Sequence, residues 1–329
     1  MPNANSTIAS EVDSLYYFIL WASVAIFAIV LFGIVYFIFK YRGESVRDKL
    51  EPQVSHNSKI EFFWTFIPTV LIVIVFFWGA KSFLRMQIYP NDSKEIMVEA
   101  SQYQFKFQYR YKDRMFGVVD SLVVPVGKPI RLIMSGTKNA FIHSFYVPNF
   151  RIKQDVMPNR YSQVWFQSDD IGTYDYYCTE YCGSGHSSMN GYVVVMSQVD
   201  YDAWYDSQVQ KAESSMNLTG AAKGEYLYKD LGCAGCHSIK KDKINIGPSF
   251  KGKWGWGESI SHTDGSVSKV DENYITRSIR YPGEVIVSGF TNQMNPDYND
   301  LPQEDINAII VSSTKIRKAL STGEIDLVS

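Results

Sequence analysis

The chain has 329 residues, which is enough for two or three domains. Hydrophobic residues make up 46 % of it, aromatic residues 15 %, and the formal net charge is −2. This balance excludes the strongly basic character that nucleic-acid binding requires, so no nucleic-acid partner is expected. The apolar residues are unevenly distributed, with two long uncharged runs near the start of the chain.

These two runs, residues 15–39 and 62–80, contain no charged side chain. A helix needs about 20 apolar residues to span a bilayer, and two such runs so close together argue against buried helices of a soluble protein. Pro68 in the second run is tolerated in membrane helices. We therefore predict a transmembrane hairpin, with helices at about 15–39 and 60–82, within an N-terminal region of residues 1–90.

The loop between the two spans is basic, whereas residues 1–14 contain no Lys or Arg. Its cations are Lys40, Arg42, Arg47, Lys49 and Lys59. By the positive-inside rule the loop faces the cytoplasm, and both chain ends lie across the membrane. The first run is too long for a signal-peptide core and no small-residue cleavage site follows it, so we expect it to remain as an anchor.

Residues 91–200 have the pattern of a β-domain. Phe105, Phe107, Tyr109 and Tyr111 alternate within residues 95–111, which predicts a strand with one buried face. Further short runs lie at residues 121–124, 130–135, 141–147, 163–166, 173–178 and 192–196. Turn residues separate these runs, and about seven short strands in about a hundred residues suit a Greek-key sandwich.

Residues 201–329 differ in composition from the predicted β-domain. Residues 201–219 are polar and lack strand alternation, so we predict a helix or a linker there. Residues 220–329 form a small third domain, mostly α, with helices at 221–232 and 304–320 and Gly- and Trp-rich loops between them. The apolar face of the last helix is formed by Ile306, Ile309, Ile310 and Leu320.

The third domain contains the sequence CAGCH at residues 233–237. C-x-x-C-H is the attachment motif of c-type haem: the thiols of Cys233 and Cys236 bond covalently to the haem, and His237 becomes an axial iron ligand. A zinc site would need a second ligand pair, and only His262 is near. A thioredoxin-like pair would need a βαβ frame, whereas this segment is helical in composition.

Met294 is the single methionine after the motif and the predicted sixth iron ligand, since Met–His ligation suits electron transfer. His262 lies among Ser, Thr, Asp and Gly, which predicts a solvated surface histidine. The sequence IGPSF (residues 246–250) resembles the class I cytochrome c segment whose proline carbonyl holds the proximal histidine, a contact that would fix the tautomer of His237.

The sandwich contains the other two cysteines, in CTEYCGSGHSSM at residues 178–189. A disulfide between Cys178 and Cys182 would close a short loop that constrains little, and it would leave His186 and Met189 unexplained. Zinc rarely recruits Met, and a catalytic Cys–His pair would give the second cysteine no role. Thiolate, imidazole and thioether donors together favour copper, with His143 from a neighbouring strand as a further ligand.

Together with the CAGCH and CTEYCGSGHSSM motifs, the whole chain resembles subunit II of a haem–copper cytochrome c oxidase. The form that it resembles has a fused C-terminal cytochrome c and is called the caa3 type. The resemblance covers EFFWTFIP in the hairpin, VPVGKPIRL, HSFYVPNFRIKQD, CTEYCGSGHSSM and the cytochrome domain. It implies a cupredoxin-like sandwich that holds a dinuclear copper-A centre, and a class I cytochrome c domain with covalent haem c.

In this family two thiolates bridge both coppers, two histidines cap one copper each, a methionine is a weak ligand and a backbone carbonyl completes the site. The matching residues are Cys178, Cys182, His143, His186, Met189 and Glu180. The Glu180 side chain matches a magnesium or manganese ligand at the interface with subunit I. Glu61 matches a glutamate at a proton-uptake channel, although an interfacial carboxylate is the simpler reading.

The resemblance implies a subunit that accepts electrons for an aerobic respiratory oxidase in a bacterial inner (plasma) membrane, with the copper and haem domains on the periplasmic side. O2 reduction and proton pumping would occur in subunit I, and the donor would be a cytochrome c or a quinol-oxidising complex, either free or in a supercomplex. The alternatives are the copper-A subunit of a nitric oxide reductase, and a quinol oxidase subunit or structural membrane protein without metals.

The chain departs from the family in the region that receives electrons. Gln102-Tyr103 stands where the family has Gln-Trp, Phe105 where a second Trp is common, and acidic docking positions fall on Gln108 and Ala140. A tethered haem domain has a high effective concentration and needs no acidic docking patch. We therefore expect Tyr103 to be dispensable for electron transfer.

The haem domain also carries a basic run, which faces a partner, the copper domain or only solvent. Its members are Lys240, Lys241, Lys243, Lys251 and Lys253.

Overall fold

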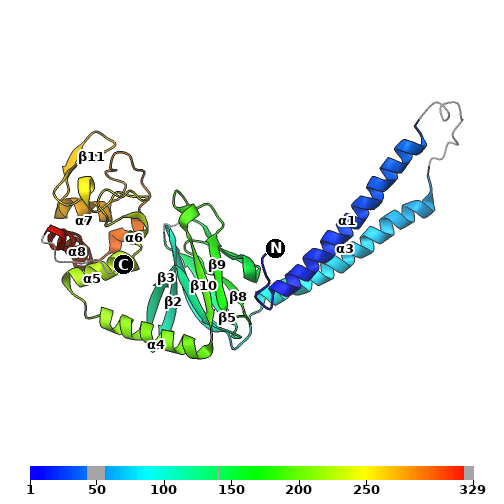
Figure 1. Cartoon of the computed structure of the whole chain (residues 1–329), viewed down its shortest axis with the longest axis horizontal. Coiled ribbons are helices and arrows are strands. Elements are labelled where there is room, and N and C mark those ends of the chain that lie inside the picture. The colour runs from blue at the N-terminus through cyan, green and yellow to red at the C-terminus, as the bar shows by residue number, and fades with distance from the viewer. Residues whose placement is uncertain (43–55, 139–140, 322–329) are drawn as a thin grey trace.

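The computed structural model describes residues 1–42, 56–138 and 141–321, the side chains of residues 313–321 excepted. Arg47, Lys49, Ala140 and the side chain of Leu320, which figure in the predictions above, lie outside the described part. Three regions follow one another along the chain: a helical hairpin, a two-sheet sandwich and a small C-terminal domain (Figure 1). The hairpin and the C-terminal domain lie on opposite sides of the sandwich.

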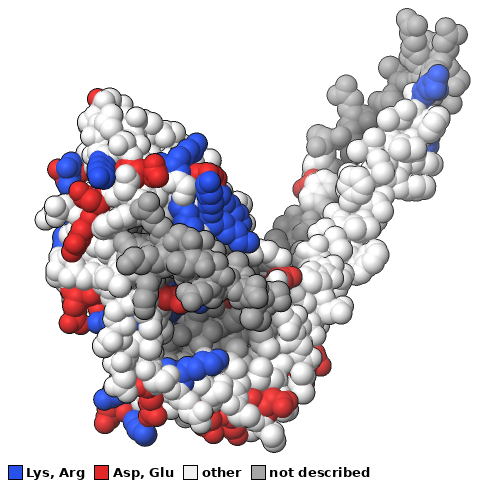
Figure 2. All heavy atoms as spheres, turned by 60° about the vertical axis from the view of Figure 1, so that its left-hand side comes forward, with Lys and Arg blue, Asp and Glu red and all other residues white. Residues whose placement is uncertain are grey.

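The hairpin consists of α1 (Ala9–Lys40) and α3 (Ser58–Gln87). Their most apolar windows have mean hydropathies of 2.8 and 2.3 and bury none of their residues within the protein, so the apolar side chains face outward. The surface of the hairpin carries few charges along its length (Figure 2). Both helices extend past the predicted apolar runs, and their length and composition suit two membrane spans.

The sandwich has two five-stranded sheets with mixed strand directions. In spatial order the first contains β3 (Arg114–Val119), β2 (Gln104–Tyr111), β1 (Lys94–Ser101), β5 (Ile130–Gly136) and β8 (Ser162–Phe166). The second contains β4 (Ser121–Pro125), β10 (Asn190–Met196), β9 (Gly172–Cys178), β6 (His143–Val147) and β7 (Ile152–Val156).

The core between the sheets is aromatic. The alternation along β2 buries Phe105, Phe107 and Tyr109, as the sequence pattern predicts. The Tyr109 hydroxyl donates to the Val123 carbonyl and accepts from the Val123 amide, at 2.9 and 2.8 Å, so its polar atom is satisfied inside the core. The predicted sandwich is therefore confirmed, although it has more strands than the sequence pattern indicated.

The segment predicted as a helix or a linker forms α4 (Gln198–Ser215), which begins at the N-cap Ser197. Tyr201 on this helix is buried, and the Trp204 ring packs against Tyr109 and Phe116 with centroids 5.2 and 6.1 Å apart. The helix therefore belongs to the packed part of the sandwich, which leaves only a few residues to lead into the next domain.

Among the described residues, the C-terminal domain contains four α-helices, two 3₁₀ turns and a small β-hairpin. The helices are α5 (Gly220–Asp230), α6 (Cys233–Cys236), α7 (Glu272–Arg280) and α8 (Gln303–Ser321), with the 3₁₀ turn η4 (Pro296–Asp300). The small β-hairpin of this domain pairs β11 (Ser259–Ser261) with β12 (Val267–Lys269), close to the 3₁₀ turn η3 (Gly252–Trp254). α5 packs directly on α8, where a Cβ on Gly224 would overlap the Ala308 carbonyl, so glycine permits the close approach.

His262 corrects one prediction, because it is only 2 % exposed instead of solvated. Its ring stacks on Tyr274 with centroids 5.8 Å apart, and its backbone forms an isolated bridge with Val287. The polar neighbours Asp264 and Ser266 form the turn beyond it, while this backbone pairing directs the imidazole inward.

Candidate copper and haem sites

Two paired strands bring the sulfur and imidazole donors of the sandwich together. β6 begins at His143 and β9 ends at Cys178, and the register pairs Phe145 with Cys178. The chain then turns through the Cys182 loop and the short 3₁₀ turn η2 (His186–Ser188) before it enters β10. All donors of the predicted copper site therefore lie at one end of the second sheet.

The donor atoms are close to one another. Sγ of Cys178 lies 3.9 Å from Nδ1 of His143 and 3.9 Å from Sγ of Cys182. Sγ of Cys182 lies 3.6 Å from Nδ1 of His186 and 3.7 Å from Sδ of Met189. The donor atoms of His143, Cys178 and Cys182 all lie within 4.8 Å of one another, a spacing that one metal site can span.

Burial and charge at this cluster suit a soft metal. His143, both cysteines and Met189 are buried, and Nε2 of His143 has no hydrogen-bond partner. Hydrogen bonding between the two sulfurs lowers the pKa of Cys178 and raises that of Cys182. Two thiolates, two imidazoles and a thioether are donors that copper prefers, and the described residues fit it.

Glu180 lies in the same loop, between the two cysteines. The Glu180 carbonyl oxygen is 3.3 Å from Sγ of Cys178, and Glu180 as a whole residue is exposed to solvent. The backbone can therefore face the copper site while the carboxylate stays available to another partner.

The haem motif is held by backbone contacts in the C-terminal domain. Nδ1 of His237 donates to the Pro248 carbonyl at 2.8 Å, and its ring stacks on Phe250 at 4.8 Å with an interplanar angle of 17°. A Cβ on Gly247 would come within 2.8 Å of the imidazole, so glycine gives the ring its space. Because Nδ1 carries the proton, Nε2 is free to bind iron.

A hollow surrounds this histidine. Two adjoining cavities have Cys233, His237 and Met294 in both of their linings, and Cys236 lines one of them. Burial lowers the pKa of His237, which favours the neutral imidazole that a metal requires. Burial raises the pKa of both motif cysteines to about 11, so they are thiols, the form that adds to a vinyl group. These residues fit a covalently attached haem.

The loop that carries the copper donors, residues 178–189 (the copper loop), is in direct contact with the C-terminal haem domain through a glutamine. The Gln293 side-chain oxygen accepts hydrogen bonds from the Tyr103 hydroxyl and from the Ser184 amide, the latter at 3.3 Å. Gln293 precedes Met294, and Ser184 lies between Cys182 and His186. Burial raises the pKa of Tyr103, so its hydroxyl remains protonated and donates.

Two further contacts close this interface. Nζ of Lys106 on β2 lies 2.8 Å from Oδ2 of Asp230 at the end of α5, and each side chain is 20 % exposed. A Cβ on Gly185 would overlap the Tyr103 ring and come within 2.6 Å of Ile246, so glycine lets the haem domain approach the copper loop. Gln102 lines the haem cavity from the sandwich side.

Gln293, Lys106 and Asp230 were not predicted from the sequence. Gln293 could have been considered because it adjoins a predicted iron ligand. Nothing local marks Lys106 and Asp230 as partners, since they lie 124 positions apart.

Glu61, Gln108 and the basic run do not line the haem cavities. Glu61 is in the first turn of α3, at the far end of the hairpin, and accepts a hydrogen bond from the Asn57 amide at 3.0 Å (Figure 1). Gln108 donates to Glu99 at 3.0 Å. The basic run lies on the loops that follow the haem motif, where Lys253 covers the Trp254 ring at 4.2 Å.

Family comparisons match nearly the whole chain. Residues 1–83 match the cytochrome c oxidase subunit II transmembrane domain, residues 83–198 the periplasmic domain of the same subunit, and residues 221–311 cytochrome c. Copper-A is implied by the second match and haem by the third.

Two relatives are both named cytochrome c oxidase subunit 2. Cytochrome c oxidase subunit 2 of Alkalihalophilus pseudofirmus is 28 % identical over 291 residues, which cover 87 % of this chain and 82 % of the relative. Its counterpart from Cereibacter sphaeroides is 28 % identical over 239 residues, covering 61 % and 77 %.

Among solved structures, the periplasmic domain of cytochrome oxidase subunit II from Bradyrhizobium japonicum is 26 % identical, with a TM-score of 0.35. The similarity covers 38 % of this chain and 99 % of that domain. Two matches to one subunit span residues 1–198, and the third spans most of the remainder. The chain therefore belongs to the cytochrome c oxidase subunit II family and joins a cytochrome c domain to the C-terminal side of the copper-A domain.

Proposed function

We propose that this subunit passes electrons from its own haem c to a dinuclear copper-A centre and on to subunit I of a respiratory oxidase, where O2 is reduced and protons are pumped. The observation that supports this route is the Gln293 contact, which joins the residue before Met294 to the loop between Cys182 and His186. When bound, the haem and the copper pair would each take up and release one electron at a time.

The protein side chains would hold these groups with little rearrangement. Cys178, Cys182, His143, His186, Met189 and the Glu180 carbonyl would hold the copper pair. Strands β6 and β9 fix two of these donors, so the cluster is largely preorganised. Cys233, Cys236, His237 and Met294 would hold the haem, with Pro248 orienting the histidine.

The interface explains how a chain without acidic docking residues can receive electrons. The haem domain is covalently attached, so its local concentration at the copper loop is high and a few contacts suffice to dock it. Lys106–Asp230 adds one ion pair of limited exposure to the Gln293 hydrogen bonds. An external donor, either a cytochrome c or a quinol-oxidising complex, would then reduce the haem domain.

Further roles complete the proposal. The exposed Glu180 carboxylate would bind magnesium or manganese at the interface with subunit I, and Glu61 would serve proton uptake. The hairpin loop would face the cytoplasm and the copper and haem domains the periplasm of a bacterial inner membrane, as Lys40, Arg42 and Lys59 indicate.

Removing one bridging thiolate separates the copper function from the haem function. In the purified oxidase, Cys182→Ser should lose copper and its near-infrared band and reduce O2 uptake to background, while the haem c remains reducible by the donor. Metal analysis, absorption spectra and oxygen uptake measure this. Cys233→Ser is the matched control, because it should disrupt haem attachment and keep the near-infrared band. Normal O2 uptake by Cys182→Ser would contradict the proposed route.

Tyr103→Leu should slow haem-to-copper electron transfer without abolishing it. The Gln293–Ser184 hydrogen bond still joins the two loops, and the lost bond contributes only about 1 kcal/mol, or about a fivefold change in the docked population. Flash-induced absorption changes of the haem measure the rate. Tyr103→Phe, which removes only the hydroxyl, is the control. Complete loss of transfer with the near-infrared band intact would show that Tyr103 is indispensable.

The docked interface should be captured by a zero-length carbodiimide, which joins an amine to a carboxylate only when the two are in contact. We expect a peptide cross-link between Lys106 and Asp230, detected by mass spectrometry of the full chain. Lys223–Asp305, at 2.6 Å within the haem domain, is the internal standard. Asp230→Asn should remove only the first cross-link. Finding the standard alone in the unmodified chain would argue against this docking geometry.

A further inference from the structure

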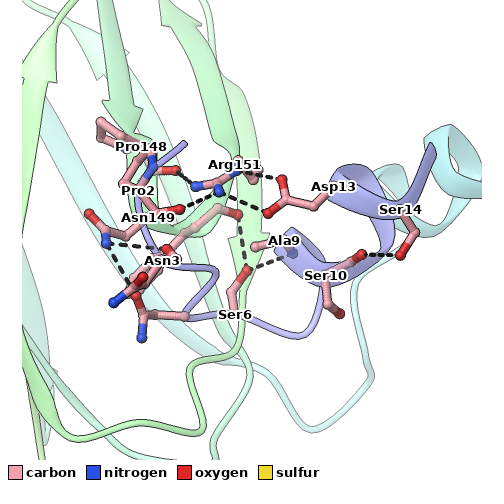
Figure 3. Close-up of polar contacts among 12 residues, drawn as sticks. Pro2, Asn3, Ser6, Ala9, Ser10, Asp13, Ser14, Pro148, Asn149 and Arg151 are labelled. Atoms are coloured by element: carbon pink, nitrogen blue, oxygen red, sulfur yellow. Dashed lines mark hydrogen bonds and ion pairs between the residues drawn. The ribbon is translucent and has the colours of Figure 1, made fainter. Parts of the chain in front are cut away.

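The segment that precedes α1 lies along the sandwich, and the first residues of the helix continue from it (Figure 3). We call these residues, 2–13, the strap. Its backbone amides donate to the sandwich at two points: Asn5 to the Asn149 carbonyl and Thr7 to the Gln167 carbonyl, both at 3.0 Å. The strap is therefore attached to two different loops of the copper-A domain.

Side chains in the middle of the strap are buried. Ser6, Ile8 and Ala9 are 8, 2 and 0 % exposed, whereas the most apolar windows of α1 and α3 bury none of their residues. The Ser6 hydroxyl donates to the Phe150 carbonyl at 3.0 Å and accepts from the Ala9 amide at 3.1 Å, so it links the sandwich to the start of α1. This burial distinguishes the strap from a loose terminal extension.

Arg151 is the centre of the contact. Nε and Nη2 of its guanidinium lie 2.8 and 2.9 Å from the two carboxylate oxygens of Asp13, in a bidentate pair. Nη2 also donates to the Pro2 carbonyl at 2.6 Å, and Nη1 donates to the Pro148 carbonyl. Its side chain is 9 % exposed, and a lysine could not supply these directed contacts at once.

The strap also connects the two helices of the hairpin. Glu11 on α1 accepts from the Ser82 hydroxyl and from Arg85 on α3, both at 2.8 Å. The Arg85 carbonyl in turn accepts from the Trp165 indole on β8 at 3.1 Å. Both helices of the hairpin are therefore connected to the sandwich, one through the strap and the other through Trp165.

The strap supplies an attachment that the chain connectivity lacks. Only residues 88–93 join the hairpin covalently to the first strand of the copper-A domain. A domain held by one short segment can pivot about it, whereas a second attachment on the other helix removes that rotation. Arg151 follows directly after the turn η1 (Pro148–Phe150), which continues from β6, the strand that begins with His143.

We propose that Arg151 is a positioning residue: with the strap, it fixes the copper-A domain on its membrane hairpin and so fixes the distance from copper-A to the next acceptor in subunit I. This inference rests on the electron route proposed above. Electron transfer falls steeply with distance, so a domain that pivots on the membrane would transfer electrons onward more slowly, while transfer within the domain pair would not change.

The test uses the assembled oxidase with its metals. In Arg151→Met, hydrogen exchange at the strap amides of residues 5–9 should accelerate by about tenfold or more, since a charge-assisted pair of low exposure is lost. The copper-A near-infrared band and the haem-to-copper rate should stay unchanged, whereas oxidation of copper-A by subunit I should slow. Asp13→Asn, which keeps the Arg151 contacts to Pro2 and Pro148, should give a smaller change in the same direction.

Lys112→Met is the matched control. Lys112 also has a positive φ, 49° against 54° for Arg151, and also forms an ion pair, but its 3.4 Å contact with Glu213 is exposed. This variant should leave strap exchange and both transfer rates unchanged. The double variant Arg151→Met with Asp13→Asn should show the same strap exchange and the same rate of copper-A oxidation as Arg151→Met alone, because the two changes remove the same ion pair.

Two results would overturn the inference. Unchanged strap exchange in Arg151→Met would show that Arg151 does not hold the strap. Faster exchange with an unchanged rate of copper-A oxidation would show that the strap does not position the domain. Failure of the proposed electron route is distinguishable from both, since copper-A in the unmodified oxidase would then not cycle at all.

Discussion

The contact between the copper loop and the loop before Met294 is the constraint on which the arrangement of the soluble part depends. Electron transfer is fast only over short distances, so the proposed route requires these two loops to meet. The pairing of β6 with β9 places the copper donors at one end of the sandwich. The packed helix α4 then leads the chain towards the haem domain, whose Gln293 reaches the copper loop.

Most of the two sites could be predicted from the sequence, because metal chemistry requires particular residue types at short spacings. CAGCH and CTEYCGSGHSSM each carry their donors within a dozen residues, and the structure brings the predicted donors of each site together. His143 was predicted from a different strand by the convergence of strands at one end of a sandwich. The membrane helices were predicted because lipid imposes a minimum apolar length.

The missed features depend on partners that are distant in the chain. β3 and β7 are the edge strands of their sheets, and buried and exposed residues do not alternate clearly along them. His262 was predicted to be solvated from its polar neighbours, yet its pairing with Val287 buries it. Arg151 and Asp13 lie 138 positions apart, and neither has a local pattern that marks the other as its partner. Local composition cannot report such contacts.

The two attachments of the copper-A domain differ in kind, and the difference follows from what each must hold. Towards the hairpin the domain is bound by a guanidinium of low exposure with a bidentate carboxylate and by buried strap residues. Towards the haem domain it is bound by a glutamine, one ion pair and glycines that permit close approach. The chain itself already keeps the haem domain near, so a small polar interface suffices there. Subunit I is a separate chain, so under the proposed electron route the strap on the membrane side contributes to fixing where copper-A lies relative to it.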